Sequence, residues 1–253
     1  YLSGVKEAVL TGVQLGSWGA DLEPAQTLSD LVGEILSSTE IPRLRLSSLE
    51  PWDVTRDLID LISNERVARH LHLPLQSGSA SVMRRMARAI TPSKYAEMIA
   101  NIRENNPGAA ITTDLLTGFP GETETEFQEN LDFVRKMDFA DGHVFTYSAR
   151  EGTPAYNFPD QVPHPVRKER NALIRQAIAE SKLAFSKKHI GAKLRVLWER
   201  SELLSENLWH VSGLTDNYLR VDARVSADLW NEFSKVRITD LTSGGVEGEI
   251  IQA

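Results

Sequence analysis

Residues that could do chemistry cluster at the C-terminal ends of successive strand-like segments. Five such segments read, in order, Glu7–Gly12, Arg43–Leu49, His70–Leu75, Ile111–Leu116 and His143–Ser148. Polar or glycine residues stand at each end: Thr11-Gly12-Val13-Gln14, Ser47-Ser48-Leu49-Glu50, Gln76-Ser77-Gly78, Asp114 with Gly118-Phe119-Pro120-Gly121, and Tyr147-Ser148-Ala149-Arg150. Ligands of parallel α/β folds lie beyond these ends. One or two polar ends would be ordinary loops, whereas five in succession favour a ligand site.

The most informative segment is ITTDLLTGFPGETETEF at 111–127, in which a strand passes through two glycines into a helix. Such a turn brings backbone close to a ligand, and a helix N-terminus attracts anions. However, three acidic residues (Glu122, Glu124 and Glu126) crowd this N-terminus, and Thr123 with Glu126 predicts a capping box that occupies free amides. We therefore expect the turn to approach a ligand that is not an anion.

Other candidate groups are weaker. His70 and His72 could both reach a metal, but no third ligand is fixed by spacing, so hydrogen-bonded histidines in a polar interior are the favoured interpretation. Arg88 could bind a carboxylate. No Ser–His–Asp arrangement or phosphate-loop lysine is visible, which argues against hydrolases and nucleoside triphosphatases. The absence of cysteine excludes disulfides, thiolate zinc sites and cysteine-ligated iron–sulfur clusters within these residues.

The elements that must position these residues alternate between strand and helix through residue 150. Helical patterns at 27–38, 55–63, 79–105 (broken near 90–92) and 123–137 separate the strands, which predicts a parallel sheet or barrel. Along 70–76 the leucines share one face while His70, His72 and Gln76 share the other, and Arg43 and Arg45 alternate likewise. We therefore expect helices on the leucine face and a wet, polar interior on the other.

The rest of the chain predicts a helix and a β module. A long helix over 166–189 lies in a segment with seven Lys/Arg against two Glu. An anionic partner should therefore contact this helix rather than the acidic segment 191–253. Four short strands follow, at Lys193–Glu199, Leu208–Leu214, Tyr218–Val225 and Ser234–Asp240. We expect a partial barrel at 1–165, a basic connecting helix at 166–190 and a β domain at 191–253.

Bulk composition bounds the class of protein. The 253 residues carry a net charge of −7, which provides no general attraction to nucleic acid. No apolar run is long enough to span a membrane, and no secretory segment opens the sequence. With the lack of cysteine, this predicts a cytoplasmic protein without a membrane partner.

Three segments resemble, in order and spacing, the radical S-adenosylmethionine methylthiotransferases: HLHLPLQSGSASVMRRMARAIT, ITTDLLTGFPGETETEF and HVFTYSAREGTPA. The tail from Gly191, with GLTDNYLRV and GVEGEI, resembles the TRAM domain that ends those enzymes. The likeness spans essentially the whole chain. Within the family, three further stretches are most similar to the bacterial enzyme that thiomethylates N6-threonylcarbamoyladenosine in tRNA: VLTGVQLGSWGADL, RLRLSSLEP and YSAREGTPA.

The resemblance implies an α/β fold, an incomplete radical-SAM (β/α) partial barrel followed by a small all-β TRAM-like barrel. It implies S-adenosylmethionine, tRNA as substrate, a sulfur donor and, in the full-length protein, two [4Fe–4S] clusters. One cluster, on a CxxxCxxC loop, would cleave S-adenosylmethionine to a radical that takes hydrogen from the adenine ring. Sulfur delivered through the second cluster would replace that hydrogen, and a second S-adenosylmethionine would supply the methyl group. The protein would position and shield these cofactors.

The resemblance also assigns roles to the strand ends. Thr11, Gly12 and Gln14 would face the amino-acid end of S-adenosylmethionine, and Gln76 and Ser77 would lie near its ribose. Asp114 and the turn with Gly118 and Pro120 would form a wall beside it. Tyr147 and Ser148 would approach the adenine, and Arg88 would be a carboxylate partner. The chain opens just before what would be the second barrel strand, so we expect a fragment without catalytic cysteines, metal or turnover.

Three alternatives remain open at this point. The chain could be a non-catalytic RNA-binding fragment, in which Arg195, Tyr218 and Arg220 contact RNA by stacking and phosphate binding. The β module is acidic, with seven basic and ten acidic residues in 191–253, which would suit a basic protein substrate better than RNA. The second alternative is therefore the related enzyme that modifies an aspartate of a ribosomal protein. A barrel enzyme such as an aldolase is disfavoured because no lysine stands at a strand end.

Overall fold

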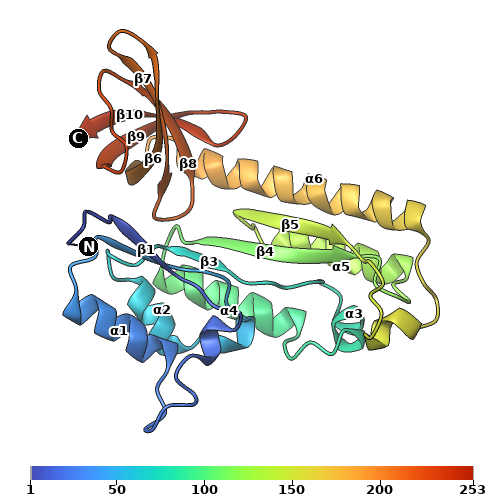
Figure 1. Cartoon of the computed structure of the whole chain (residues 1–253). Helices are drawn as coiled ribbons and strands as arrows, with labels where there is room; N and C mark the ends of the chain where they lie inside the picture. The colour runs from blue at the N-terminus through green and yellow to red at the C-terminus, as the bar shows by residue number, and fades with distance from the viewer. Residues whose placement is uncertain (1, 253) are drawn as a thin grey trace.

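The structure is a computed structural model that describes residues 2–252, and its N-terminal part is a curved parallel sheet (Figure 1). The strands are β1 (Glu7–Leu10), β2 (Arg43–Leu46), β3 (His70–His72), β4 (Ala110–Thr117) and β5 (Asp141–Thr146). β1 pairs with β2, and β3 pairs with β4 and β4 with β5, all in parallel. Single bridges from Leu44 to Val67 and from Ser48 to His72 join the two groups. The prediction of a parallel partial barrel is therefore confirmed.

Helices cover the apolar face of this sheet. They are α1 (Leu28–Ser38), α2 (Arg56–Ile62), α3 (Ala80–Arg85), α4 (Pro92–Asn105) and α5 (Glu124–Lys136), with short 3-10 turns η1 (Leu15–Ser17), η2 (Pro51–Asp53) and η3 (Pro154–Asn157). Leu71, Leu73 and Leu75 are buried in one core with residues of these helices. The predicted break in the third helix is wider than expected, because α3 ends at Arg85 and α4 starts only after the Thr91 cap.

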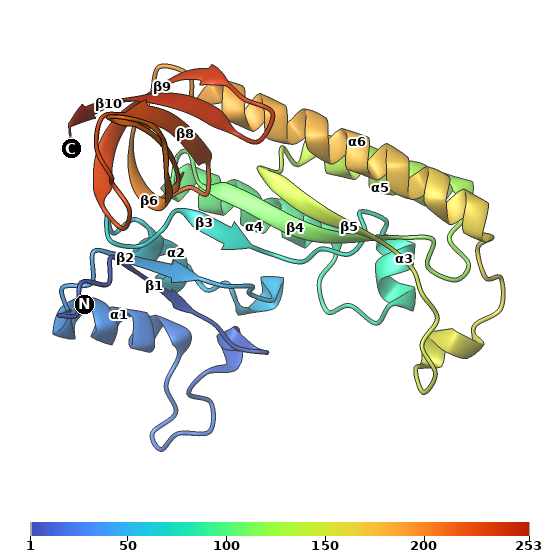
Figure 2. The same cartoon turned by 45° about the horizontal axis from the view of Figure 1, so that its top comes forward.

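The long helix α6 (His164–Lys188) runs along β5 and α5 and leads into the second domain (Figure 2). Its Arg170 is buried and its guanidinium lies 2.8 Å from Glu122 and 3.0 Å from Glu124. This contact ties α6 to the start of α5. The helix therefore fixes the position of the glycine turn that precedes α5.

The second domain is a closed barrel with the strand order β10-β8-β7-β6-β9 in the described residues. Its strands are β6 (Lys193–Ser205), β7 (Leu208–Thr215), β8 (Arg220–Val225), β9 (Phe233–Leu241) and β10 (Val246–Gln252). We predicted β8 from Tyr218, but it starts at Arg220 because Tyr218 has a φ of +64°, in a turn. β10 was not predicted, since glycines and glutamates in GVEGEI mask its alternation. Gly248 is required there, because a Cβ would lie 2.3 Å from a methyl carbon of Val236.

No helix in residues 2–252 is long and apolar enough to cross a membrane.

Candidate functional site

A cavity of about 670 Å³ lies between the polar face of the parallel sheet and the β-barrel. Side chains from both domains line it, among them Arg45, His70, His72, Asp114, His143 and Tyr218. These residues come from β2, β3, β4, β5 and the turn before β8. The polar interior that strand alternation predicted is thus a real cavity, and the β-barrel forms part of its wall.

The two histidines of β3 are joined through a hydroxyl on the next strand. His70 Nε2 lies 2.9 Å and His72 Nδ1 3.0 Å from Thr112 Oγ1. His72 Nε2 lies 3.4 Å from Asp114 Oδ1, near enough for electrostatic attraction but outside hydrogen-bond alignment. Burial, Arg45 and His72 together lower the pKa of His70 to about 3, so its imidazole is neutral.

No group of three or more His, Cys, Asp or Glu side chains in the described part of the chain is arranged to hold a metal ion. The favoured interpretation of His70 and His72, as hydrogen-bonded histidines in a polar interior, is confirmed by their shared bond to Thr112.

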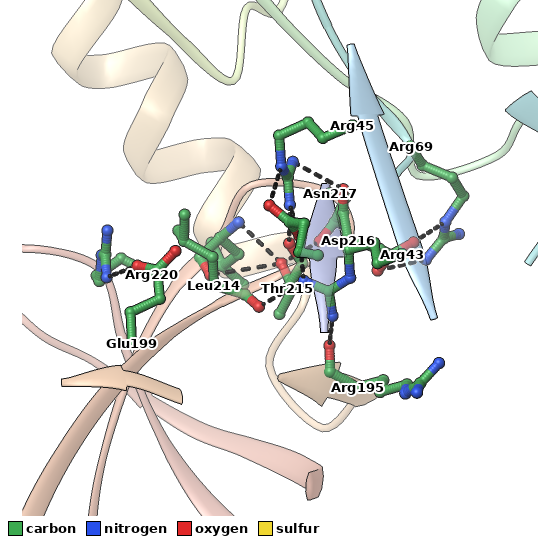
Figure 3. Close-up of polar contacts among 12 residues, drawn as sticks. Arg43, Arg45, Arg69, Arg195, Glu199, Leu214, Thr215, Asp216, Asn217 and Arg220 are labelled. Carbon is green, nitrogen blue, oxygen red and sulfur yellow. Dashed lines mark hydrogen bonds and ion pairs between the residues drawn. The ribbon is translucent and has the colours of Figure 1, made fainter. Parts of the chain in front are cut away.

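The β-barrel is fixed over the sheet by arginines that donate to main-chain carbonyls (Figure 3). Arg43 donates to the carbonyls of Leu214 and Arg195 at 3.0 and 3.1 Å, and Arg45 donates to that of Thr215 at 3.1 Å. Burial lowers the pKa of Arg43, and the nearby Glu7 carboxylate opposes this shift. Each carbonyl accepts a charge-assisted hydrogen bond, which is stronger than a neutral one.

This contact corrects one expectation. The face of β2 that bears Arg43 and Arg45 was expected to be wet, yet both arginines are buried. The end of β7, with Leu214 and Thr215, and the following Asp216 cover them and supply hydrogen-bond partners, together with Glu7 on β1. The wet part of the interior therefore begins beyond Arg45, towards Asp114 and His143.

Two more contacts close the same interface. Arg69 Nε lies 2.5 Å from a carboxylate oxygen of Asp216. Asn217 donates to the carbonyl of Gly108 at 3.2 Å and contacts His189 Nε2 at 2.9 Å, so it links the sheet, the end of α6 and the β-barrel. The interface is thus polar and specific.

The predicted residues at the end of β1 are open to solvent. Thr11, Gly12 and Gln14 are exposed, and the carbonyl of Gln14 accepts hydrogen bonds from the amide and hydroxyl of Ser17. They lie outside the residues that line the cavity. Their role towards a cofactor stays a prediction.

The end of β3 has an unusual backbone. Gln76 has a φ of +77°, which residues other than glycine rarely adopt. Its amide donates to the carbonyl of Asp114 and its carbonyl accepts from the amide of Leu116. Strained positions held by surrounding bonds occur often at binding sites. Ser77 is fully buried, and its hydroxyl accepts from the amide of Ser79 at 3.2 Å.

The glycine turn before α5 uses its amides within the protein. Gly118 donates to Glu122 Oε1 at 3.1 Å, and Gly121 donates to the carbonyl of Asp160 at 2.9 Å. The predicted capping box between Thr123 and Glu126 is present. At Gly118 a Cβ would lie 2.1 Å from Cγ of Arg167, so α6 packs directly on the turn, where Pro120 is also buried. These contacts agree with the expectation that the turn holds no anion.

At the end of β5, Tyr147 is buried against Phe119, with ring centroids 5.5 Å apart. Its hydroxyl is buried and has no hydrogen-bond partner among residues 2–252. The following Ser148 is exposed. The guanidinium of Arg88 lies 3.5 Å from Glu50 Oε2, and its predicted role as a carboxylate partner in the cofactor site stays a prediction.

The three predicted RNA-binding residues occupy different environments. Tyr218 stacks on His70, with ring centroids 4.1 Å apart and planes 8° apart, and lines the cavity. Arg195 lies over the ring of Phe233 at 3.8 Å, and Arg220 lies 2.8 Å from Glu199. Tyr218 alone of the three therefore belongs to the cavity wall.

Sequence reasoning missed Thr112 and the capping turn at 214–216. The signal for Thr112 was present, because it shares a strand face with Asp114 and pairs in register with His72. The segment 214–216 lies in the quoted stretch GLTDNYLRV, but nothing in that stretch indicates that its main-chain carbonyls accept hydrogen bonds from Arg43 and Arg45.

Comparison with known proteins gives consistent matches. Residues 16–134 match the family model of the Radical SAM superfamily. The tRNA-2-methylthio-N(6)-dimethylallyladenosine synthase of Clostridium tetani is 35% identical over 248 residues, which cover 98% of this chain and 54% of that protein. The threonylcarbamoyladenosine tRNA methylthiotransferase MtaB of Bacillus subtilis is 35% identical over 257 residues, covering 99% and 56%. The chain thus spans about half the length of the curated relatives it matches.

Among solved structures, coproporphyrinogen III oxidase (HemN) from Escherichia coli matches 83% of this chain and 50% of its own, with 14% identity and a TM-score of 0.48.

Proposed function

Because this chain carries a radical SAM domain and is similar along nearly its whole length to tRNA methylthiotransferases, we propose that it forms the substrate-side part of such an enzyme. The observation that carries the proposal is the 35% identity over 98–99% of the chain, through both domains. The structure agrees with it, since side chains of both domains line the cavity.

The strand ends fit S-adenosylmethionine. Tyr147 Oη, a buried oxygen there, has no hydrogen-bond partner within residues 2–252. Asp114 Oδ1 and Glu50 Oε2 make only longer charged contacts, 3.4 Å to His72 Nε2 and 3.5 Å to Arg88. Unpaired buried polar atoms are costly, so they indicate a missing partner. S-adenosylmethionine offers an ammonium group, ribose hydroxyls and an exocyclic amine, all of which donate to such oxygens. We propose that Asp114, Gln76 and Tyr147 orient it, and that Thr11, Gly12, Gln14, Ser77 and Ser148 complete the site.

An iron–sulfur cluster does not fit the residues of this chain, because cysteine thiolates hold such clusters and the sequence contains none. When bound to the whole enzyme, clusters would supply the electrons and sulfur that the chemistry requires. The residues here would bind and orient the substrate and keep water from it. We assign no residue of this chain to the binding of the sulfur donor.

For the RNA, we propose that the cavity receives a modified adenine and that Tyr218 forms its wall. Enzymes that modify a base take it out of its stack and hold it in a pocket, often against an aromatic ring. Tyr218 is half exposed at the cavity while its ring is held by His70. The surrounding basic residues of α6, Arg175 and Lys182, lie in a groove beside β5 that shares His143 and Phe145 with the cavity.

We propose N6-threonylcarbamoyladenosine as the substrate. The support is the likeness of 9–22, 43–51 and 147–155 to enzymes acting on it, and the match to the Bacillus subtilis protein. Relatives named for dimethylallyladenosine are equally identical, so the test must separate the two.

The test is nucleoside mass spectrometry of tRNA from cells in which the gene for this protein is disrupted. We expect the 2-methylthio form of N6-threonylcarbamoyladenosine to disappear and its unthiolated precursor to accumulate. Loss of the 2-methylthio form of the dimethylallyl nucleoside instead would show that dimethylallyladenosine is the substrate, while the proposed reaction would stand. Unchanged tRNA together with a changed ribosomal protein would reject the tRNA proposal.

A further inference from the structure

The side chains of His70, Thr112, His72 and Asp114 form one continuous polar row across β3 and β4. Thr112 Oγ1 lies 2.9 Å from His70 Nε2 and 3.0 Å from His72 Nδ1. His72 Nε2 lies 3.4 Å from Asp114 Oδ1. The row reaches from the buried ring under Tyr218 to the wet part of the cavity.

A hydroxyl donates one hydrogen bond and can accept two. With both imidazoles neutral and the Thr112 proton placed within the row, the row can point in two directions. In the first, His70 Nε2–H donates to Thr112, the Thr112 hydroxyl donates to His72 Nδ1, and His72 Nε2–H faces the Asp114 carboxylate. In the second, each hydrogen bond is reversed, and the bare lone pair of His72 Nε2 faces that carboxylate.

Two independent observations favour the first direction. The negative charge of Asp114 attracts an N–H and repels a lone pair across 3.4 Å. At the other end, His70 Nδ1 is buried without a hydrogen-bond partner among residues 2–252. The second direction would leave a buried N–H there, and orphaned buried N–H groups are rarer than unsatisfied acceptors.

We propose that Thr112 is a positioning residue that transmits the charge of Asp114 to His70, so that both histidines carry their proton on Nε2. The consequence concerns recognition. Asp114 Oδ1 remains an acceptor that no described residue satisfies, so this wall of the cavity selects a ligand group that donates a hydrogen bond or carries positive charge. The claim depends on contacts within the chain and does not require the proposed reaction.

The test is the tautomer of each imidazole, read from long-range proton–nitrogen correlation spectra of the 15N-labelled chain at pH 7.5. His70→Gln and His72→Gln assign the signals. In the unaltered protein we expect both rings to show the Nε2–H tautomer alone. Thr112→Val removes the linking hydroxyl, and we expect it to convert His70 from one tautomer to a mixture.

Two variants serve as matched controls. Thr112→Ser keeps the hydroxyl and should restore the single tautomer. Thr117→Val removes a buried hydroxyl of the same strand that bonds the carbonyl of Phe145, and both rings should remain unchanged. Asp114→Asn removes the charge and should lower the Nε2–H population of His72, which keeps the proposal testable if Thr112→Val does not fold. An Nδ1–H tautomer on either ring of the unaltered protein, or unchanged rings in Thr112→Val or Asp114→Asn, would overturn the proposal.

Discussion

Glu7 on β1 holds Arg45 on β2 by two hydrogen bonds, at 2.9 Å to Nε and 3.1 Å to Nη2, beneath the β-barrel. The same carboxylate lies 3.1 Å from Arg43. One acidic side chain therefore compensates two buried guanidinium groups at the junction of the domains. The junction is organised around charge rather than around apolar contact.

Replacement of Glu7 by Gln should destabilise the protein strongly. Removing one member of a buried ionic group leaves uncompensated charge, and the cost is about 3 kcal/mol. Urea unfolding monitored by tryptophan fluorescence would measure the free energy of unfolding. Lys6→Gln breaks the neighbouring exposed pair with Glu232 and should cost less than about 1 kcal/mol. Equal effects of the two variants would show that the Glu7 contact is not buried in solution.

The stack between His70 and Tyr218 should contribute a measurable coupling energy across the domains. A double-mutant cycle with His70→Ala and Tyr218→Ala is expected to yield about 0.5–1.5 kcal/mol, as aromatic pairs do. Tyr218→Phe keeps the ring and should behave like the unaltered protein. Tyr156 has a similar exposure and is the control, since its replacement by Ala should show no coupling to His70. Zero coupling in the first cycle would contradict the observed docking of the β-barrel.

Glu126 should make stability depend on acid pH. Hydrogen bonds from Arg85 lower its pKa from 4.5 to about 2 in the folded protein. The unfolded chain then binds a proton first as the pH falls, so this contribution is complete above about pH 5 and is lost between about pH 4.5 and pH 2. Unfolding free energies measured from pH 6 to pH 2 should fall less steeply in Glu126→Gln. Glu124→Gln, which alters an exposed neighbour, should keep the original slope, and identical slopes for all three proteins would refute the assignment.

Much of the parallel sheet could be predicted because strand-like segments alternate with helical patterns, and β2 and β3 alternate leucine with polar residues. Thr123 with Glu126 marked a helix start that the structure bears out. The burial of Arg43 and Arg45 could not be predicted, because their partners are carbonyls about 170 residues later in the chain. Main-chain acceptors leave no trace in side-chain identity, and neither does the relative position of two domains.

The candidate site divides in the same way. Asp114 and His72 were each visible as a polar residue of a predicted strand. The place of Tyr218 was not visible, since a tyrosine in a β module is equally consistent with an outer RNA surface. Its φ of +64° turns the ring towards His70. Such a conformation depends on packing rather than on residue type.

The 253 residues alone should bind no iron–sulfur cluster. Cluster irons are held by thiolates, and this sequence has no cysteine to supply one. After anaerobic incubation with iron and sulfide followed by desalting, we expect less than about 0.1 iron per chain and no absorbance near 400 nm. The double variant His70→Gln/His72→Gln shows whether any residual iron is bound adventitiously by these two imidazoles. Stoichiometric iron in the unaltered protein would contradict the expectation.

Replacement of Gln76 by glycine should not lower the free energy of unfolding if the backbone strain at this position serves binding rather than folding. A residue other than glycine at a φ of +77° stores about 1 kcal/mol, which glycine relieves at the expense of a more flexible unfolded chain. We therefore expect Gln76→Gly to leave the free energy of unfolding unchanged or to raise it by up to about 1 kcal/mol. Gln128→Gly, inside α5, should lower it by about 1 kcal/mol, because glycine weakens a helix interior. If both replacements destabilise equally, the amide and carbonyl of Gln76 do not hold it in the left-handed region, and the strain at the end of β3 has no functional meaning.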